Sequence, residues 1–349
     1  MGFRLCMNAE GPAGASARGS GASAASGVGA AESPSAKVTA PAPVPTANGK
    51  EISVKLATGV TLDFVPCPAG SFEMGNSNVE LSPQFRHKVT ITRPFWIGKY
   101  QVTRRVWAVF DSREKNYKNI TVAMLGGLDA AKSNNITYND ITRFCDWMNK
   151  RYKSKLPRGY VFRLPTEAEW EYALNANADD PEDLYVKFKK GNRSNRHQIM
   201  VVKNDFRDKG ADVPEWELPS MTVGTKKPNA WGIYDMLGNG SEFVLDTVVV
   251  SEARDKEDGK ENRTLNQICI YEKEETDPLR MAENTKSKAN GTIYALLRGS
   301  TDWHQVHDAK WFWKSRVRIS SHFKALTFRL VIGPDLLKER GIKLPDLGK

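Results

Sequence analysis

A long segment of small residues limits where this chain of 349 residues can fold. Residues 7–50 are mainly Ala, Gly, Ser and Pro, with almost no large apolar side chains. Such a segment cannot bury enough apolar surface to offset the entropy that it would lose on ordering, so we predict a disordered linker. We expect the folded domain to occupy residues 51–334 and to leave residues 335–349 as a C-terminal tail.

The chain is basic, but its sequence contains no recognisable nucleic-acid-binding motif. The formal net charge is +10, and the stretches 187–209 and 254–275 are mixed in sign. We interpret this charge as that of an ordinary surface and expect no specific nucleic-acid partner. No apolar run has the length of a membrane span, and the N-terminus has no hydrophobic stretch of the signal-peptide type.

The four cysteines form no familiar metal or redox motif. None of Cys6, Cys67, Cys145 and Cys269 belongs to a Cys-x-x-Cys pair. Cys67 lies in a strand-like apolar run, and Cys145 lies on the apolar side of a predicted helix. Small thiols are commonly buried in such places.

Short strands and helices alternate irregularly along the predicted domain, which indicates the α+β class. Residues 52–56 and 60–65 alternate apolar and polar side chains around Thr58-Gly59, as a β-hairpin does. Further strands are predicted at 89–92, 95–98, 292–298, 317–319 and 327–331. The polar stretches 175–228 and 251–290 are predicted to be long surface loops.

Three helices are predicted from capping residues and apolar periodicity. Thr103 can cap a helix over 103–110. A second helix over Asn139–Tyr152 has an apolar stripe, with Asn139 or Asp140 as its cap. Thr166-Glu-Ala-Glu169 has the spacing of a capping box and predicts the start of the third helix.

Several motifs, in the same order along the chain, resemble the formylglycine-generating enzyme (sulfatase-modifying factor) family. They are Phe64-Val-Pro-Cys-Pro-Ala-Gly-Ser-Phe-Glu-Met-Gly75, Lys99-Tyr-Gln-Val-Thr103, Phe162-Arg-Leu-Pro-Thr-Glu-Ala-Glu-Trp-Glu-Tyr-Ala173, Asn229-Ala-Trp-Gly-Ile-Tyr-Asp-Met-Leu-Gly-Asn-Gly-Ser-Glu242 and Leu297-Arg-Gly-Ser-Thr301. The resemblance covers residues 51–334. It implies a variant of the C-type-lectin fold with little regular secondary structure and long loops.

The first residues are similar to the strand that closes this family's domain. Gly2-Phe-Arg-Leu5 matches that strand, and the chain's own closing copy is Thr327-Phe-Arg-Leu-Val331. Our hypothesis is that residues 1–6 end a preceding, tandem domain of the same family. In that case any export signal lies further upstream, and an extracytoplasmic location is compatible with the sequence.

The resemblance also bears on copper, which oxidase members of the family bind through two cysteines near the C-terminus. No cysteine follows Cys269 here, and without gaps the two positions fall on His304 and Ala309. Copper(I) requires soft thiolate ligands in such a site. We therefore expect neither copper binding nor formylglycine generation by that route.

The alternative is an oxidoreductase that binds non-heme iron or copper through histidines. His304 and His307 would be the ligands, with His322 or Asp302 as a third. The competing interpretation is that these histidines pack among the neighbouring tryptophans.

By resemblance to the family, the loop 234–242 would hold a structural calcium ion. The side chains of Asp235 and Glu242 and the carbonyls of Gly238 and Gly240 would be its ligands. Calcium binds several hard oxygens, and glycine lets the backbone turn its carbonyls inward. The alternative is a metal-free turn in which Glu242 caps amides or pairs with an arginine.

A third candidate site is a binding surface where the family presents its cleft. It combines aromatic and charged side chains suited to a protein, peptide or glycan ligand, namely Asp302, Trp303, His304, His307, Trp311 and Trp313. The function we predict is a non-catalytic or divergent binding module, tethered by residues 7–50 to a larger protein.

Overall fold

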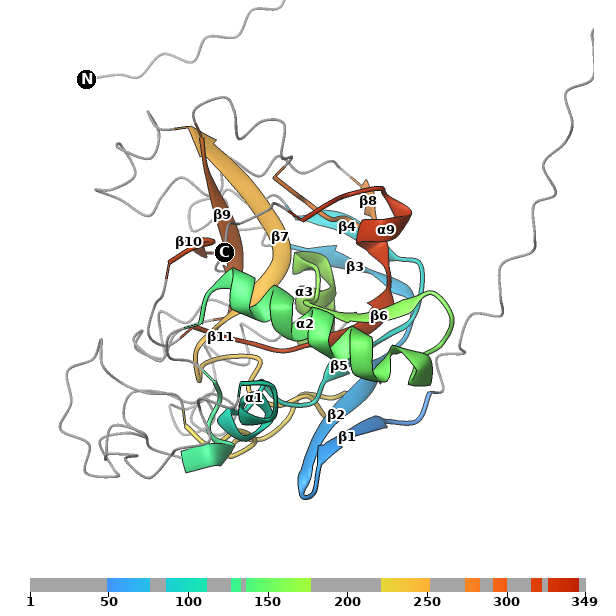
Figure 1. Cartoon of the computed structure of the whole chain (residues 1–349). Helices are drawn as coiled ribbons and strands as arrows, with labels where there is room; N and C mark the ends of the chain where they lie inside the picture. The colour runs from blue at the N-terminus through green and yellow to red at the C-terminus, as the bar shows by residue number, and fades with distance from the viewer. Residues whose placement is uncertain are drawn as a thin grey trace, which may run out of the picture. The chain divides into compact units, whose positions relative to one another are not determined.

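The computed structural model describes residues 49–75, 86–111, 127–132, 136–176, 221–251, 274–282, 291–299, 315–321 and 326–344. In these residues the chain forms three sheets and a few helices (Figure 1). The helices are α1 (Arg104–Phe110), α2 (Tyr138–Tyr152), α3 (Glu167–Asn175) and α9 (Leu336–Glu339), with 3-10 turns η3 (Gly127–Asp129) and η4 (Lys153–Lys155). This mixture confirms the α+β class.

The first sheet joins the beginning of the domain to its end. Its strands are β1 (Ile52–Ala57), β2 (Val60–Cys67), β5 (Phe95–Gly98), β12 (Val331–Pro334) and β6 (Tyr160–Arg163), in that order. β1 and β2 form the predicted antiparallel hairpin. The last strand, β12, is inserted between β5 and β6 and pairs antiparallel with both.

Two smaller sheets complete the fold. One has the order β10-β9-β7-β11, formed by β10 (Ser315–Arg318), β9 (Gly291–Arg298), β7 (Ser241–Ser251) and β11 (Leu326–Phe328). The other has the order β3-β4-β8, formed by β3 (Gly70–Met74), β4 (His87–Ile91) and β8 (Glu274–Thr276). Strand β8 lies inside the stretch 251–290, which the sequence predicted as a loop.

The predicted closing strand 327–331 is divided between two sheets. Its first part, β11, runs parallel to β7, with Thr327 opposite Glu242. Its last residue begins β12, with Val331 opposite Ile97 of β5. Arg329 lies at the crossing and is fully buried.

The helix caps agree with the sequence except at α2. Thr103 caps α1 by accepting from Val106 N, and Thr166 with Glu169 forms the predicted capping box of α3. The prediction of Asn139 or Asp140 as the cap of α2 was wrong. Thr137 is the cap, and Asp140 is the N3 partner of a second capping box.

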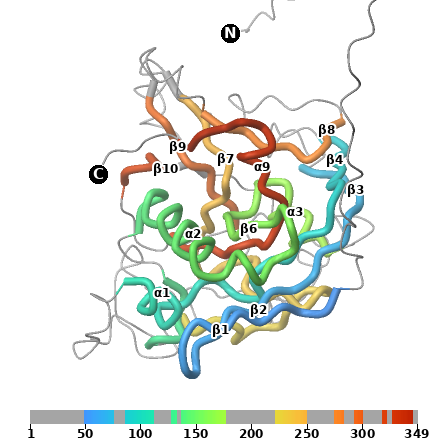
Figure 2. The backbone as a smooth tube through the Cα atoms, turned by 45° about the vertical axis from the view of Figure 1, so that its right-hand side comes forward, coloured from blue at the N-terminus to red at the C-terminus, as the bar shows by residue number. Residues whose placement is uncertain are grey.

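The hydrophobic core has two clusters, each centred on one long helix. Figure 2 shows α2 running beside β6, with the β1–β2 hairpin below it and the β7–β9 pair above. Phe144 of α2 stacks on Trp107 of α1 at 5.4 Å between ring centroids and contacts Phe328 of β11 at 5.8 Å. The second cluster surrounds Trp170 and Tyr172 of α3.

The segment after β12 packs on the domain rather than leaving it. Leu336 of α9 is buried, and Glu339 forms an ion pair with Arg93 at 2.7 Å. Among the described residues, no helix combines the length and the apolar character required to cross a membrane.

Candidate functional site

The loop that precedes β7 has a backbone suited to turning carbonyl groups inward. Asp235, Gly238, Asn239 and Gly240 have φ angles of 55°, 80°, 56° and 118°. Glycine adopts this left-handed region without a Cβ clash, and Asp and Asn tolerate it better than most residues. The carbonyls of Asp235, Gly238 and Gly240 consequently face the side chain of Gln101.

Gln101 Nε2 lies where four oxygen atoms converge. It is 3.4 Å from Asp235 O, 3.5 Å from both Gly238 O and Gly240 O, and 3.0 Å from Glu242 Oε1. The contacts to the carbonyls exceed the usual N–H···O distance of about 3.0 Å. If the amide oxygen of Gln101 stood at the position of Nε2, its distances to the carbonyls would equal the spacing of about 3.4 Å between neighbouring oxygens that each lie about 2.4 Å from a calcium ion.

The carboxylate of Glu242 is neutralised by Arg329. Arg329 Nε donates to Oε2 at 2.7 Å and Nη2 donates to Oε1 at 2.6 Å, while Trp170 Nε1 donates to Oε2 at 2.9 Å. All three side chains are almost completely inaccessible. The structure thus shows the arginine pairing considered above as the alternative to calcium. The two arrangements are compatible, because each carboxylate oxygen has more than one acceptor position.

Arg329 also connects the loop to the first sheet. It donates to Gly98 O at 3.1 Å, at the end of β5, and to Tyr234 O at 3.0 Å and Asp235 O at 3.2 Å. A guanidinium group has five donors in a rigid fork, which suits several acceptors from different segments. Arg329 therefore fixes the loop against the crossing between β11 and β12.

Two side chains of the loop hold residues 221–224. Asn239 accepts from Met221 N at 2.7 Å and donates to Met221 O at 3.2 Å. Asp235 Oδ2 accepts from Gly224 N at 2.6 Å, and burial raises the pKa of Asp235 to about 6. The sequence predicted the Asp235 carboxylate as a ligand. In the structure its main-chain carbonyl joins the converging oxygens, while the carboxylate holds the neighbouring segment.

The oxygen atoms around Gln101 fit a calcium ion. Gln101 Oε1 is buried and has no hydrogen-bond partner in the described part of the chain. Turning the amide over would place Oε1 beside the four other oxygens, an arrangement that a bound cation would stabilise. Main-chain and amide oxygens dominate this set. Accordingly, the described ranges contain no group of three or more His, Cys, Asp or Glu suited to a metal ion.

The described residues contain two of the four thiols. Cys67 and Cys145 are free and buried, as the sequence predicted. Burial raises the pKa of Cys67 well above its usual value and that of Cys145 to about 12. Both thiols therefore stay protonated at neutral pH, whereas a metal binds the thiolate. Cys6 and Cys269 lie outside the described residues.

The predicted binding surface also lies outside the described residues, including Asp302, Trp303, His304, His307, Trp311 and Trp313. The strand that precedes this surface in the sequence, β9, is described. Arg298 ends β9, is fully buried, and pairs with Glu171 and with Glu167 of α3, the latter at 3.4 Å. Its guanidinium also lies over the ring of Trp170, 5.3 Å from the centroid. The chain is thus anchored to α3 just before residues 300–314.

Comparison with known proteins identifies the class to which this fold and loop belong. The sulfatase-modifying factor enzyme 1-like domain matches residues 53–333. The chain therefore belongs to that family, as its motifs predicted.

Two solved structures have the same fold. "Treponema denticola variable protein 1" aligns with a TM-score of 0.56 at 18% identity, over 81% of this chain and 99% of that one. PvdO from Pseudomonas aeruginosa aligns with a TM-score of 0.52 at 20% identity, over 81% and 99%. The predicted family fold is confirmed.

Curated relatives match shorter stretches. The formylglycine-generating enzyme of Bos taurus is 27% identical over 113 residues, which are 32% of this chain and 26% of that protein. The chaperone protein LppX of Paenibacillus barcinonensis is 26% identical over 215 residues, 53% of this chain and 72% of that one. The match thus spans about a quarter of the bovine enzyme.

Proposed function

We propose that this protein is a binding module of its family and does not generate formylglycine with copper. One observation carries the proposal: no cysteine follows Cys269 in the whole sequence. Copper(I) prefers soft thiolates, and the two thiols of the described part, Cys67 and Cys145, are buried and protonated. The chain therefore lacks the ligand pair that the known reaction requires.

The ligand of this module would be a protein, peptide or glycan bound at the segment that follows Arg298. That segment contains the aromatic and charged side chains of Asp302, Trp303, His304, His307, Trp311 and Trp313. Aromatic anchors next to charged groups are typical of recognition surfaces. The name of the relative LppX, a chaperone protein, supports a protein partner.

The test of this function is a peptide conversion assay. Purified protein, supplied with copper(I), is incubated with a sulfatase-type cysteine peptide, and mass spectrometry monitors the aldehyde, with a formylglycine-generating enzyme as positive control. We expect no conversion, and aldehyde formation would refute the proposal. Stoichiometric iron or copper in the purified protein, lost in a His304→Ala/His307→Ala variant, would instead favour the oxidoreductase.

We also propose that calcium stabilises the loop before β7. Its ligands would be the carbonyls of Asp235, Gly238 and Gly240, the Glu242 carboxylate and the amide oxygen of Gln101. The unpartnered Gln101 Oε1 and the distances of 3.0–3.5 Å between the Gln101 amide nitrogen and the four other oxygens support this. A bound ion would join the loop to the segment after β5.

Thermal unfolding with calcium and with a chelator tests this proposal. We expect calcium to raise the melting temperature of the wild type and of Gln101→Glu, which keeps an oxygen ligand. Gln101→Leu should respond weakly. An identical calcium response in Gln101→Leu, or no response in the wild type, would contradict the assignment.

A further inference from the structure

A short exposed segment contains an unusual density of positive charge. Between Lys150, near the end of α2, and Arg158, before β6, five of nine residues are Lys or Arg and none is acidic. All five cations are exposed. This segment differs from the stretches 187–209 and 254–275, which are mixed in sign. We call residues 150–158 the basic segment.

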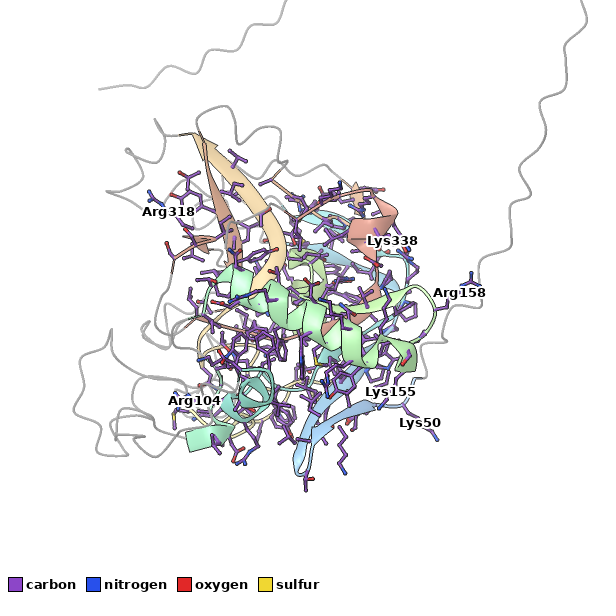
Figure 3. The ribbon with its side chains drawn as sticks, in the orientation of Figure 1. Lys50, Arg104, Lys155, Arg158, Arg318 and Lys338 are labelled. Atoms are coloured by element: carbon purple, nitrogen blue, oxygen red, sulfur yellow. The ribbon has the colours of Figure 1, made fainter. Side chains whose placement is uncertain are left out.

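Strand β1 and the residues just before it contribute two more lysines, Lys55 and Lys50. Tyr152 donates to Leu56 O at 3.5 Å. Trp96 donates to Lys50 O at 3.2 Å and packs edge-on against Tyr160, with ring centroids 6.0 Å apart. Through these contacts the main chain at residues 50 and 56 is linked to Tyr152 within the basic segment and to Tyr160 just after it. Figure 3 shows Lys50, Lys155 and Arg158 extending outward on this side of the molecule.

These cations are largely unneutralised by the described residues. Lys153 pairs with Asp335 only at 3.8 Å, while Arg151 and Lys155 lie over the rings of Trp147 and Tyr152. Lys150 and Arg158 form no ion pair with any described residue. The surface thus retains a surplus of positive charge.

An apolar pocket opens beside the basic segment, with Lys153 in its lining. Its volume is about 260 Å³. The apolar part of its lining comes from α2, from β6 and the residue after it, from β7 and from the segment after β12. It consists of Cys145, Val161, Phe162, Leu164, Leu245, Leu337 and Leu344. Typical small-molecule pockets have roughly 300–1,000 Å³, so this one suits a single large side chain better than a whole ligand.

Two polar side chains of the pocket, those of Asn149 and Arg163, already have partners inside the protein. Asn149 donates to Phe162 O at 2.8 Å and accepts from Phe162 N at 2.9 Å. Arg163 pairs with Glu169 at 2.6 Å. An apolar group could therefore pack against Asn149 and Arg163 without taking a hydrogen-bond partner from either. Asp146 and Asp335, which also line the pocket, are the acids that a ligand would meet.

We propose that the pocket and the basic segment together form a docking surface for an acidic peptide segment of a partner protein. An aromatic or large aliphatic side chain of that segment enters the pocket, and its carboxylates lie along Lys150, Lys153, Lys155 and Arg158. Charge complementarity selects this partner. A nucleic acid is disfavoured, because the nearby rings of Trp147 and Tyr152 are covered by cations and offer no stacking face. The proposal uses no residue of the range 302–313, so a negative result here would not contradict the function proposed above, and the reverse also holds.

Fluorescence anisotropy with the full chain tests the docking surface. The probe is a labelled peptide of Asp and Glu residues around one central Trp. Comparison probes replace the Trp with Gly, or replace the acids with Lys. We expect the first peptide to bind, binding to weaken about tenfold without the Trp, and binding to weaken further with added salt. Absence of binding, equal binding of the Gly peptide, or tighter binding of duplex DNA or of anionic lipid vesicles would overturn the proposal.

Two variants with matched controls separate the contributions of charge and pocket. Lys150→Glu/Lys155→Glu should weaken binding at least about tenfold, whereas Lys88→Glu/Lys227→Glu makes the same charge change elsewhere and should not. Thr142→Trp places a ring in the lining of the pocket and should block it. Arg143→Trp adds the same ring at the next, exposed position of α2 and should bind normally. Circular dichroism confirms folding, and equal affinities within either pair would refute the site.

Discussion

Helices α2 and α3 begin with the same capping motif but differ in burial: α2 is partly exposed, and α3 is completely buried. Each starts with a capping box, Thr137 with Asp140 in α2 and Thr166 with Glu169 in α3. Helix α2 buries one face and exposes the cations that follow it. Every residue of α3 is buried, including its three glutamates.

The difference shows that local sequence decides where a helix begins, while distant residues decide whether it can be buried. Glu169 is neutralised by Arg163 of β6, and Glu171 by Arg298 of β9. Asp246 of β7 accepts from Glu167 N, at the first turn of α3, at 2.7 Å. Buried charges are tolerated only when partners of this kind are in place.

The largest effect should come from removing one partner of a buried pair at α3. Arg163→Met leaves the Glu169 carboxylate, which is 6% exposed, without its counter-charge. We expect the free energy of unfolding to fall by about 3–5 kcal/mol, measured by denaturant titration. Arg163→Met/Glu169→Met should regain a good part of this loss, and a double variant no more stable than the single one would contradict the charge argument.

Asp246 should make the surroundings of α3 sensitive to pH. Burial, with the nearby Glu167 charge, raises the pKa of Asp246 to about 6 from its ordinary 3.8. The folded state therefore binds the proton more tightly than the unfolded state, so this stabilisation is full below about pH 4 and is lost as pH rises through 6. Relative to Asp246→Asn, the wild type should lose on the order of 2 kcal/mol between pH 4 and 7. A pH-independent difference between the two unfolding free energies would refute this.

The two capping boxes can be compared directly, because the capping Thr of each helix can be replaced by Ala. Thr166→Ala and Thr137→Ala each remove a side chain that accepts from the N3 amide. We expect losses of about 1 kcal/mol in each helix, and a larger loss for Thr166, which is buried at 2% exposure against 6% for Thr137. Chemical denaturation of both variants measures this. A larger loss at Thr137 would mean that burial does not set the difference.

The smallest effect should come from the exposed ion pair of α2. Arg143 pairs with Asp140, and its side chain is 66% exposed. Arg143→Met should change the free energy of unfolding by less than about 0.5 kcal/mol, in contrast to the same replacement of Arg163. If Arg143→Met and Arg163→Met lowered the free energy of unfolding equally, the contrast between the exposed ion pair of α2 and the buried ion pair of α3 would be wrong.

The sequence predicted the elements better than the contacts between them. The hairpin, the caps of α1 and α3 and most strands were correct, because each depends on neighbouring residues. The cap of α2 was missed because its box ends in Asp140 rather than Glu or Gln, the residues usual at that position. Residues 335–349 were predicted to be a tail, although Leu336 is buried.

At the candidate site, the sequence indicated the loop 235–242 but neither Gln101 nor Arg329. Gln101 is 141 residues from Glu242 in sequence, and Arg329 is 87 residues from it. No local pattern links such distant positions. The motif Lys99-Tyr-Gln-Val-Thr103 was recognised as a family feature, yet only the three-dimensional structure shows that its glutamine meets the carbonyls of the loop.

The insertion of β12 between β5 and β6 has a consequence for biosynthesis. The ribosome makes β5 and β6 long before it reaches residues 331–334, so the middle of the first sheet stays open through almost the entire elongation of the domain. The unpaired edges of β5 and β6 must then be kept from other nascent chains until β12 has been made and has paired with them. Polypeptides released early would lack the strand that joins the two halves of the sheet, and proteases would have ready access to them.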